Sequence, residues 1–139
     1  MKTLLTLLLI ATASPAIAAT AIAPPVATQQ VELYRIAPGQ HEAFLRFIAR
    51  CDTVNRAAGV APRQLFVHSD GAEWDFMLLQ PAHYTPAEQA RIDVAWDKLE
   101  MPSGADFFVA IRKFIASHTD TTVHGPTTAD DYLATMRPK

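Results

Sequence analysis

The sequence predicts an α+β fold, and three observations carry this prediction. Short runs of β-branched and aromatic residues alternate with longer stretches in which apolar residues recur every three or four positions. Proline and glycine stand between most of these segments and mark their ends. The resulting order is β-α-β-β-α-β within 139 residues, a length that fits a single domain. This order is the ferredoxin-like split βαβ arrangement, in which both helices cover one face of an antiparallel four-stranded sheet.

The first strand and the first helix are expected to meet at a Pro-Gly turn. Residues 30–37 are rich in β-branched and aromatic side chains and are followed by Pro38-Gly39. A helix is expected over residues 40–58, and Gly59 stands where glycine commonly ends a helix. Four apolar residues of this segment have the spacing of one helix face, namely Phe44, Phe47, Ile48 and Cys51.

Two further strands are expected at residues 63–68 and 74–80. The polar residues 69–73 between them have the composition of a hairpin loop. The second strand is almost entirely apolar in its first half, so that both of its faces should be covered. We therefore expect it to lie in the interior of the sheet.

The second helix is expected to be split. Thr85-Pro86-Ala87-Glu88 is a capping box with proline at the first helical position. The helix should run to residue 100, with one face formed by Ile92, Trp96 and Leu99. Pro102-Ser103-Gly104 interrupts it, and Ser103 can cap a second part over residues 105–117. The side chains expected to point inward from this second part are Phe107, Phe108, Ile111, Phe114 and Ile115.

The C-terminal region is expected to contain a short last strand and a small helix. Residues 119–124 are polar and β-branched, as in a strand at the edge of a sheet. Thr128-Ala129-Asp130-Asp131 has the composition of a helix cap. The helix that follows would carry Tyr132, Leu133 and Met136.

The N-terminus is typical of a secretory signal. Lys2 precedes an apolar stretch that is too short to span a bilayer, and Ala16-Ile17-Ala18 supplies the small residues of a cleavage site. We expect residues 1–18 to be a signal peptide, residues 19–29 a flexible lead-in and residues 30–139 one domain. The protein would then be exported to the periplasm or secreted. The alternative interpretation of residues 1–18 is a buried N-terminal helix.

Composition and charge exclude several classes of protein. The net charge of −2 argues against a nucleic-acid partner, which needs a clustered basic surface. A single cysteine forbids an intrachain disulfide and a cysteine zinc cluster. After residue 18 no apolar stretch is long enough to cross a membrane. The five histidines have no recognised metal-ligand spacing, so we expect neither a metal nor a cofactor, with haem held by one histidine as an open alternative.

The expected sheet requires a cover on its second face. Both helices occupy one face, while the apolar strand at residues 74–80 should be buried on both. A second copy of the same chain, packed through a two-fold axis, is the simplest cover. We therefore expect a homodimer, and an enclosed space of this kind is a natural pocket for a small apolar or aromatic molecule.

Three segments resemble a known superfamily. They are the Tyr34-Arg35-Ile36-Ala37-Pro38-Gly39 turn with the helix start Glu42-Ala43-Phe44, the Trp74-Asp75 strand, and the run His118-Thr119-Asp120-Thr121. Together they resemble dimeric α/β-barrel proteins, which include antibiotic-biosynthesis-monooxygenase-like and NIPSNAP-like domains. The resemblance implies a dimeric ferredoxin-like domain in an exported group without a named activity. Relatives of this fold include cofactor-free monooxygenases, haem-degrading enzymes, isomerases and proteins of no known activity, so that fold does not choose among these functions.

A histidine and an aspartate are candidates for acid–base chemistry. If His68 and Asp75 lie opposite each other on one face of the hairpin, the carboxylate would raise the pKa of the imidazole and fix its tautomer. Such a pair suits a general base. A register shift of one residue would separate them. The alternative is a polar pair on the surface near a turn.

Other residues are candidates for a ligand pocket. Trp74 stands at the start of the apolar strand, and Arg35 would attract an anionic ligand if it faced the pocket, or would extend to water if it did not. His118 is expected at the end of the helix over residues 105–117, where its structural role would be to bond free carbonyl groups. Cys51, on an apolar helix face, is expected to be a buried small hydrophobe.

Three functions remain open at this point. The first is an exported, dimeric domain that binds a small, mostly apolar molecule. The second is a cofactor-independent monooxygenase or isomerase that uses His68 with Asp75. The third is a structural module for dimeric interaction. The sequence decides neither for nor against catalysis.

Overall fold

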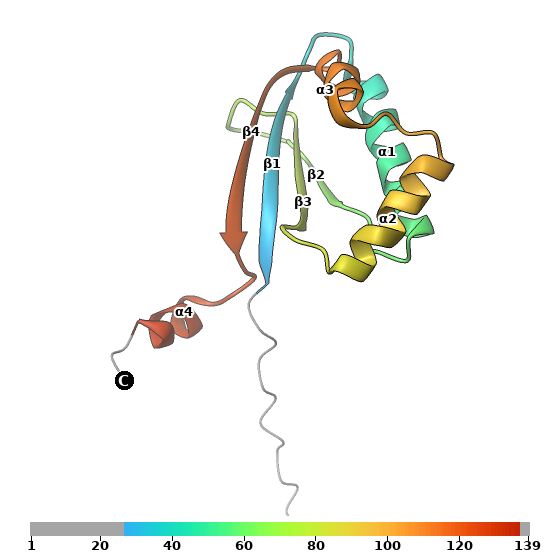
Figure 1. The fold of residues 1–139 in the computed structure, drawn as a ribbon. Helices are drawn as coiled ribbons and strands as arrows, with labels where there is room; N and C mark the ends of the chain where they lie inside the picture. The colour runs from blue at the N-terminus through green and yellow to red at the C-terminus, as the bar shows by residue number, and fades with distance from the viewer. Residues whose placement is uncertain (1–26, 137–139) are drawn as a thin grey trace, which may run out of the picture.

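The computed structural model describes residues 27–136, and the expected signal peptide and most of the expected lead-in lie outside them. The elements are, in chain order, β1 Thr28–Ile36, α1 His41–Ala57, β2 Gln64–Val67, β3 Phe76–Pro81, α2 Pro86–Lys98, α3 Gly104–Arg112, β4 Ile115–His124 and α4 Ala129–Thr135 (Figure 1). The sheet has the strand order β2-β3-β1-β4, and each neighbouring pair is antiparallel. This is the predicted ferredoxin-like topology, with β3 in the interior of the sheet.

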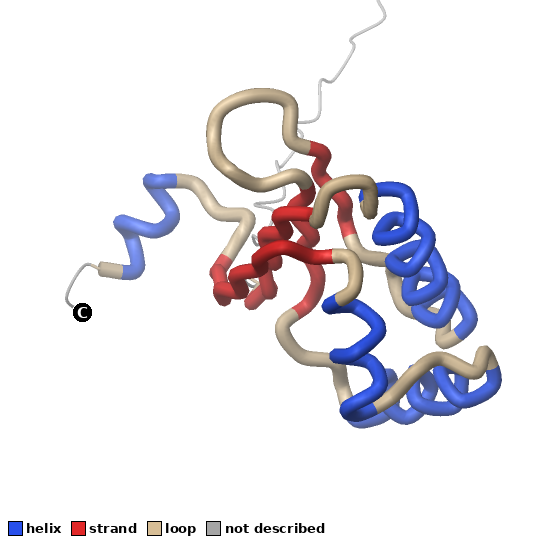
Figure 2. The backbone as a smooth tube through the Cα atoms, turned by 90° about the horizontal axis from the view of Figure 1, so that it is seen from above, coloured by secondary structure: helices blue, strands red, loops and turns tan. Residues whose placement is uncertain are grey.

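The helices α1, α2 and α3 lie together on one side of the sheet, while α4 projects from the opposite side beyond the end of β4 (Figures 1 and 2). The core fills the space between the sheet and these helices. Its buried residues are Tyr34, Ile36, Phe44, Phe47, Ile48, Cys51, Val54, Ala58, Phe76, Leu78, Ile92, Ala95, Met101 and Ile111. The apolar face predicted for α1 is therefore confirmed, and it packs on the sheet.

Local sequence signals explain how the predicted helices begin and end. Backbone N–H of Gln40 donates to the carbonyl of Ala37, with Gly39 at φ +77, which closes the Pro-Gly turn between β1 and α1. Gly59 has φ +69 directly after the C-cap of α1, a conformation that favours glycine. At α2, the side chains of Thr85 and Glu88 form both hydrogen bonds of the predicted capping box.

The second part of the split helix is shorter than predicted. The apolar spacing indicated a helix as far as residue 117, whereas α3 ends at Arg112 and β4 begins at Ile115. From Ile115 to His124 the chain instead pairs with β1 along its whole length. This ladder satisfies the backbone polar groups of both strands, which outweighs the local helical pattern.

Other predicted details also need correction. The apolar strand begins at Phe76 and not at residue 74, so Trp74 and Asp75 belong to the loop before β3. Ser103 is the N-cap of α3 but makes no capping hydrogen bond with its side chain. Phe108, which was expected to point inward, is 61% exposed and does not belong to the buried core.

Alternation along β1 assigns the two faces of the sheet. Tyr34 and Ile36 are buried beneath the helices, and Glu32, two residues before Tyr34, faces the same way. The residues between them alternate to the other face, namely Val31, Leu33 and Arg35. The face away from the helices, here called the open face, carries an apolar centre. By the strand register its apolar members are Val31, Leu33, Phe66, Met77, Leu79 and Val123.

Candidate functional site

The candidate residues line two cavities beside the sheet. The first, here called the sheet–helix cavity, lies between β1, β4, α1 and α3 and has a volume of about 220 Å³. The second, here called the rim pocket, lies at the end of β1 beside the β2–β3 loop and has a volume of about 520 Å³. His118 lines the first cavity, whereas Arg35, His68, Trp74 and Asp75 line the second. The structure therefore divides the five candidate residues between two places.

A polar row on the sheet forms one wall of the sheet–helix cavity. Tyr34 on β1 pairs with His118 on β4, and Glu32 pairs with Asp120. Residues paired in this way across antiparallel strands project from the same face. The four side chains therefore stand side by side on the helix-facing side of the sheet, and all four line the cavity.

Close contacts link the members of this row. The His118 ring stacks on Tyr34 with centroids 4.9 Å apart and planes at 21°. His118 Nε2 lies 2.7 Å from Asp120 Oδ1. Tyr34 donates its hydroxyl hydrogen to Glu32 Oε2 at 2.7 Å, and Gln80 Nε2 donates to Glu32 Oε1 at 2.6 Å. The Glu32 carboxylate is thus held by two donors, and the His118 ring is held by Tyr34 and Asp120.

Burial governs the ionisation of Tyr34. Its side chain is 4% exposed, and burial raises the pKa of its hydroxyl far above the ordinary value, with a further contribution from the negative charge of Glu32. The hydroxyl is therefore neutral at physiological pH and donates to Glu32. Tyr34 consequently serves to position His118 and Glu32 and does not supply a proton.

The lining of the cavity also includes an arginine with an unused donor. Arg63 Nη1 is buried and makes no hydrogen bond within residues 27–136. It lies 3.6 Å from Asp52 Oδ1, a distance that gives an ion pair but exceeds hydrogen-bond reach. A buried guanidinium donor without an acceptor is costly. Arg63 belongs to the lining of the cavity, so a ligand that brings an acceptor would satisfy this donor.

Apart from Arg112 on α3, the rest of the lining is apolar. It comprises Ile48, Phe107, Phe108, Ile111 and Ile115, together with the lone cysteine, Cys51. Cys51 is 1% exposed, and burial raises the pKa of its thiol, which the nearby charge of Arg63 partly offsets. The expected role of Cys51 as a buried small hydrophobe is confirmed.

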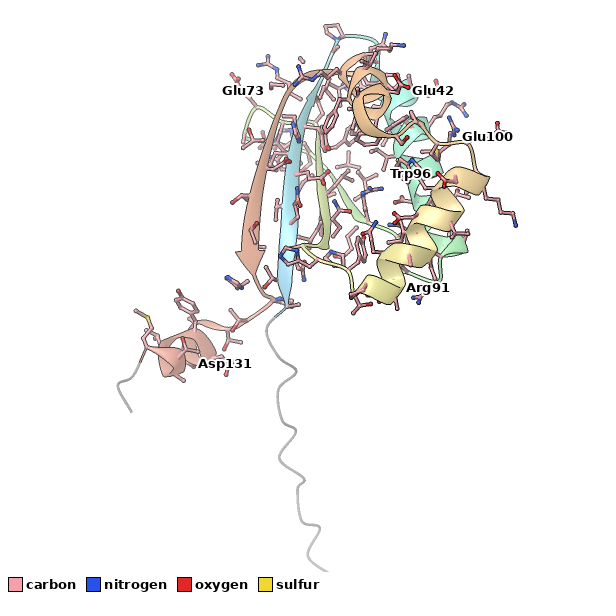
Figure 3. The ribbon with its side chains drawn as sticks, viewed as in Figure 1. Glu42, Glu73, Arg91, Trp96, Glu100 and Asp131 are labelled. Carbon is pink, nitrogen blue, oxygen red and sulfur yellow. The ribbon has the colours of Figure 1, made fainter. Side chains whose placement is uncertain are left out.

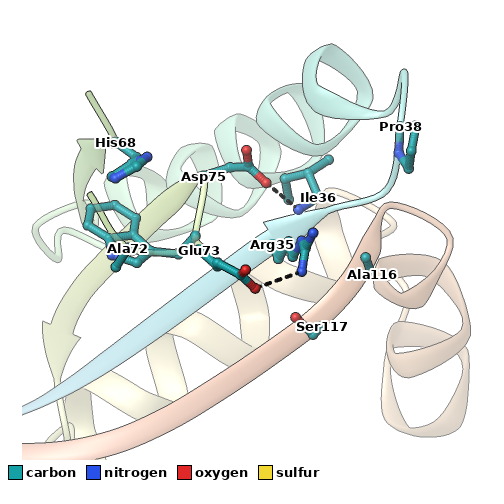
Figure 4. A pocket seen from close by; sticks show the side chains of 10 residues that line it. Arg35, Ile36, Pro38, His68, Ala72, Glu73, Asp75, Ala116 and Ser117 are labelled. Atoms are coloured by element: carbon teal, nitrogen blue, oxygen red, sulfur yellow. Dashed lines mark hydrogen bonds and ion pairs between the residues drawn. The ribbon is translucent and has the colours of Figure 1, made fainter. Parts of the chain in front are cut away.

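The rim pocket is more exposed and holds paired charges (Figure 4). Arg35 Nη1 lies 3.1 Å from Glu73 Oε2, and these side chains are 56% and 85% exposed. Asp75 Oδ2 accepts a hydrogen bond from the backbone N–H of Ile36 at 2.6 Å. Glu73 lies near the end of the sheet, across the molecule from Arg91 and Trp96 on α2 (Figure 3).

The prediction that the side chains of His68 and Asp75 pair is wrong, because the carboxylate of Asp75 lies beside a different histidine. The two backbones do pair, since His68 N–H donates to the Asp75 carbonyl at 2.9 Å. The imidazole nearest the Asp75 carboxylate is however that of His41, whose Nε2 lies 3.4 Å from Oδ1. His68 instead packs on Trp74, with centroids 4.8 Å apart, and its buried Nε2 has no hydrogen-bond partner in the described part of the chain.

The His–Asp pair in contact that the structure places in the sheet–helix cavity is His118 with Asp120. The prediction located His118 at a helix end, and the structure corrects this to the interior of β4, because the strand begins at Ile115. An i, i+2 spacing puts two side chains on one face of a strand but not of a helix. The pair was therefore hidden by the predicted helix boundary, and Arg63 carried no signal in the sequence at all.

Residues 27–136 contain no cluster of three or more His, Cys, Asp or Glu side chains that could hold a metal ion. Within the same residues, no helix has both the length and the apolar character that a membrane span requires.

Comparison with known proteins gives matches among solved structures only. No family model matches the chain. No curated protein matches it either. Solved structures similar to the chain include protein Atu4242 of Agrobacterium tumefaciens, at 13% identity over 73% of this chain and 95% of that protein, with a TM-score of 0.48. They also include a NIPSNAP family protein of Agrobacterium tumefaciens strain C58, at 14% identity over 76% and 90%, with a TM-score of 0.48.

A third similar structure is that of an antibiotic-biosynthesis-monooxygenase-like protein from Chloroflexus aurantiacus J-10-fl. It is 17% identical over 73% of this chain and 96% of that protein, with a TM-score of 0.35. The similar structures thus include both kinds of protein named in the sequence resemblance. With TM-scores below 0.5, these similar structures do not assign the fold. The ferredoxin-like fold is assigned from the strand order β2-β3-β1-β4.

Proposed function

We propose that this domain binds a small, mostly apolar molecule that carries a neutral carbonyl group, and that it does so in the sheet–helix cavity. The observation that carries the proposal is the buried and unpartnered donor of Arg63, a residue in the lining of a cavity that joins apolar walls to a polar row. Pockets of this composition, with apolar walls and a few converging polar groups, are the usual form of a small-molecule site.

The size of the cavity limits the ligand. Its volume of about 220 Å³ lies below the range of roughly 300–1,000 Å³ that is typical of pockets for drug-sized ligands. A single aromatic ring with a short side chain is therefore a better match than a fused polycyclic molecule. Burial of such a ligand against Phe107 and Ile111 would contribute about 0.8 kcal/mol for each CH₂-sized group.

The charges around the cavity determine the polar part of the ligand. Arg63 requires an acceptor, which either a carbonyl or a carboxylate oxygen supplies. The cavity is also lined by Arg112 and by the carboxylates of Glu32 and Asp120, so two guanidinium groups already stand against two carboxylates. A neutral carbonyl satisfies Arg63 without adding a third negative charge to this balanced set. The proposal therefore favours a ketone or a similar carbonyl compound.

The binding test uses three probes of matched shape, namely phenylacetone, phenylacetate and propylbenzene. Binding is measured by titration with methyl and amide NMR spectra of the full domain. We expect phenylacetone to shift the signals of Ile111 and Ile115 and to bind more tightly than the other two. Binding of all three with equal strength, or shifts confined to another surface, would contradict the proposal.

Variants locate the site. Arg63→Met should weaken phenylacetone binding but leave propylbenzene unaffected, and Arg46→Met, an exposed arginine on α1, is the matched control. If Arg63→Met fails to fold, Ile111→Trp provides a second test, because the larger side chain should fill the cavity and abolish binding of every probe.

We further propose that two copies of the chain pack through the open face. The apolar centre of this face, which includes Leu33, Met77 and Leu79, is otherwise left to solvent. The sedimentation coefficient of the wild-type chain should be that of a dimer, and Met77→Glu should yield a monomer. Val94→Glu is the control, since Val94 is 68% exposed on the helical side. A monomeric wild type would refute this part of the proposal.

The proposed location is outside the cytoplasm. It rests on the signal-like layout of residues 1–18. Expression of the full chain in a bacterial host, followed by mass spectrometry of the periplasmic fraction, should give a product that begins at Ala19. An uncleaved product that stays in the cytoplasm would refute the location and would leave the binding proposal intact.

A further inference from the structure

The His118–Asp120 pair lines the sheet–helix cavity and sets a carboxylate against one nitrogen of the imidazole. Nε2 of His118 lies 2.7 Å from a carboxylate oxygen of Asp120. A carboxylate this close favours the neutral tautomer that carries its proton on Nε2. This leaves Nδ1 unprotonated, which is the form of a general base.

The ring of this base is held in a fixed orientation. Tyr34 stacks on His118 at 4.9 Å, and the Tyr34 hydroxyl is itself held by Glu32. A carboxylate beside Nε2 also stabilises the imidazolium that forms when Nδ1 accepts a proton. The side chain of His118 remains 36% exposed, so that it can exchange its proton with solvent.

Arg63 supplies a complementary group in the same cavity. A carbonyl oxygen that accepts a hydrogen bond from the Arg63 guanidinium gains negative charge when the neighbouring C–H bond is broken. The hydrogen bond to Arg63 therefore strengthens as charge develops on the oxygen. An interaction that is stronger in the transition state than in the bound substrate accelerates the reaction.

We propose that the sheet–helix cavity catalyses enolisation of a neutral carbonyl compound, with His118 as the base, Asp120 as its positioning residue and Arg63 as the oxyanion donor. His118 Nδ1 takes the proton from the carbon next to the carbonyl. The C–H electron pair forms the C=C bond, and the carbonyl π pair moves to the oxygen beside Arg63. Return of the proton to the same carbon exchanges it with solvent, and return to a conjugated carbon isomerises the substrate. The step needs no oxidant and no reductant.

The substrate class follows from these residues and rests on the binding proposal above. It is a small aromatic or unsaturated ketone with an acidic C–H next to the carbonyl. An ester or acid with a poorly acidic C–H would bind without reacting.

The test is the exchange of the benzylic protons of phenylacetone in D₂O, followed by proton NMR. We expect the wild-type domain to accelerate the loss of these signals over buffer. His118→Gln should lower the protein-dependent rate on the order of 10²-fold or more, the range of general-base catalysis. It should leave the dissociation constant of phenylacetone almost unchanged, which separates the chemical step from binding.

Two further variants sharpen the result. Asp120→Asn should reduce the exchange rate at saturating phenylacetone while the dissociation constant and the amide spectrum are retained, whereas Asp120→Glu should restore part of the rate. His124→Gln is the matched control, because His124 lies on the same strand and is exposed outside the cavity. It should exchange phenylacetone at the wild-type rate.

The outcomes distinguish the two proposals. If phenylacetone does not bind in the cavity, the proposed function fails. If it binds there but the wild type exchanges its protons no faster than His118→Gln, binding stands and the inferred catalysis is overturned. An equal loss of rate in His124→Gln would also overturn the assignment of His118.

Discussion

Asp75 Oδ2 accepts a hydrogen bond from the backbone N–H of Ile36 at a distance of 2.6 Å. The contact joins the loop before β3 to the last residue of β1, where the ladder with β4 is interrupted by a bulge. Arg35 pairs there with Ser117 and Ile36 with Ile115, so that Ala116 is the extra residue. The aspartate thus supplies an acceptor to a backbone group at the irregular end of the sheet.

Replacement of Asp75 should therefore destabilise the domain. Asp75→Ala leaves the partly buried N–H of Ile36 without this acceptor, and we expect a loss of roughly 1–3 kcal/mol in the free energy of unfolding. Urea denaturation followed by circular dichroism measures this loss. Asp70→Ala, at an exposed position in the same loop, should change the stability by less than about 0.5 kcal/mol. Equal effects of both replacements would contradict this role of Asp75.

The same contact predicts a pH dependence. The hydrogen bond from Ile36 lowers the pKa of the Asp75 carboxyl below its ordinary value of 3.8, and His41 lowers it further. A lowered pKa in the folded state means that Asp75 contributes stability above the pKa of the unfolded chain. This contribution decreases as the pH falls through that value towards the folded pKa. The stability difference between wild type and Asp75→Asn should thus be present at pH 7 and diminish below about pH 4.

Urea denaturation at several pH values between 7 and 2.5 measures that difference. A constant difference across the whole range would show that Asp75 does not titrate with folding.

The core should be most sensitive at Phe44. This residue is 0% exposed and its ring lies between those of Tyr34 and Phe76, at centroid distances of 4.9 Å and 5.6 Å. Phe44→Ala should lower the free energy of unfolding by about 3–5 kcal/mol, because the cavity left behind cannot be refilled. Val109→Ala, at a position that is 59% exposed on α3, should cost less than about 0.5 kcal/mol. Chemical denaturation of the two variants measures the loss in the free energy of unfolding for each. Similar losses for both would contradict the prediction.

Cys51 should be unreactive in the folded protein. Burial keeps the side chain 1% exposed and raises the pKa of its thiol, so the reactive thiolate is scarce at neutral pH. Dithionitrobenzoate should label the native chain far more slowly than the chain in urea, where the thiol is accessible. Rapid labelling of the native chain would show that the sheet–helix cavity opens to solvent at Cys51.

Several features followed from the sequence because they depend on residues close together in the chain. The capping box of Thr85 with Glu88 involves residues three positions apart, and the apolar face of α1 is a periodic pattern within one helix. The Pro38-Gly39 turn is equally local. These local signals were sufficient to give the order of strands and helices, and the order was sufficient to predict the topology of the sheet.

The candidate site depended on contacts between distant segments. His118 meets Tyr34 only because β4 pairs with β1 in one register, and that pairing begins at Ile115, where the local pattern indicated a helix. The partner of Asp75 was decided in the same way, since His41 comes from the start of α1 and not from the neighbouring strand.

The amino-acid sequence by itself thus determined the elements and their topology, because capping, turns and apolar periodicity act over a few residues. Only the tertiary structure decided that His118 and Asp120 share the lining of one cavity with Arg63, whose Nη1 donor is unused. The physical reason is that strand register and side-chain burial are set by the packing of the whole sheet against its helices, which no single segment encodes.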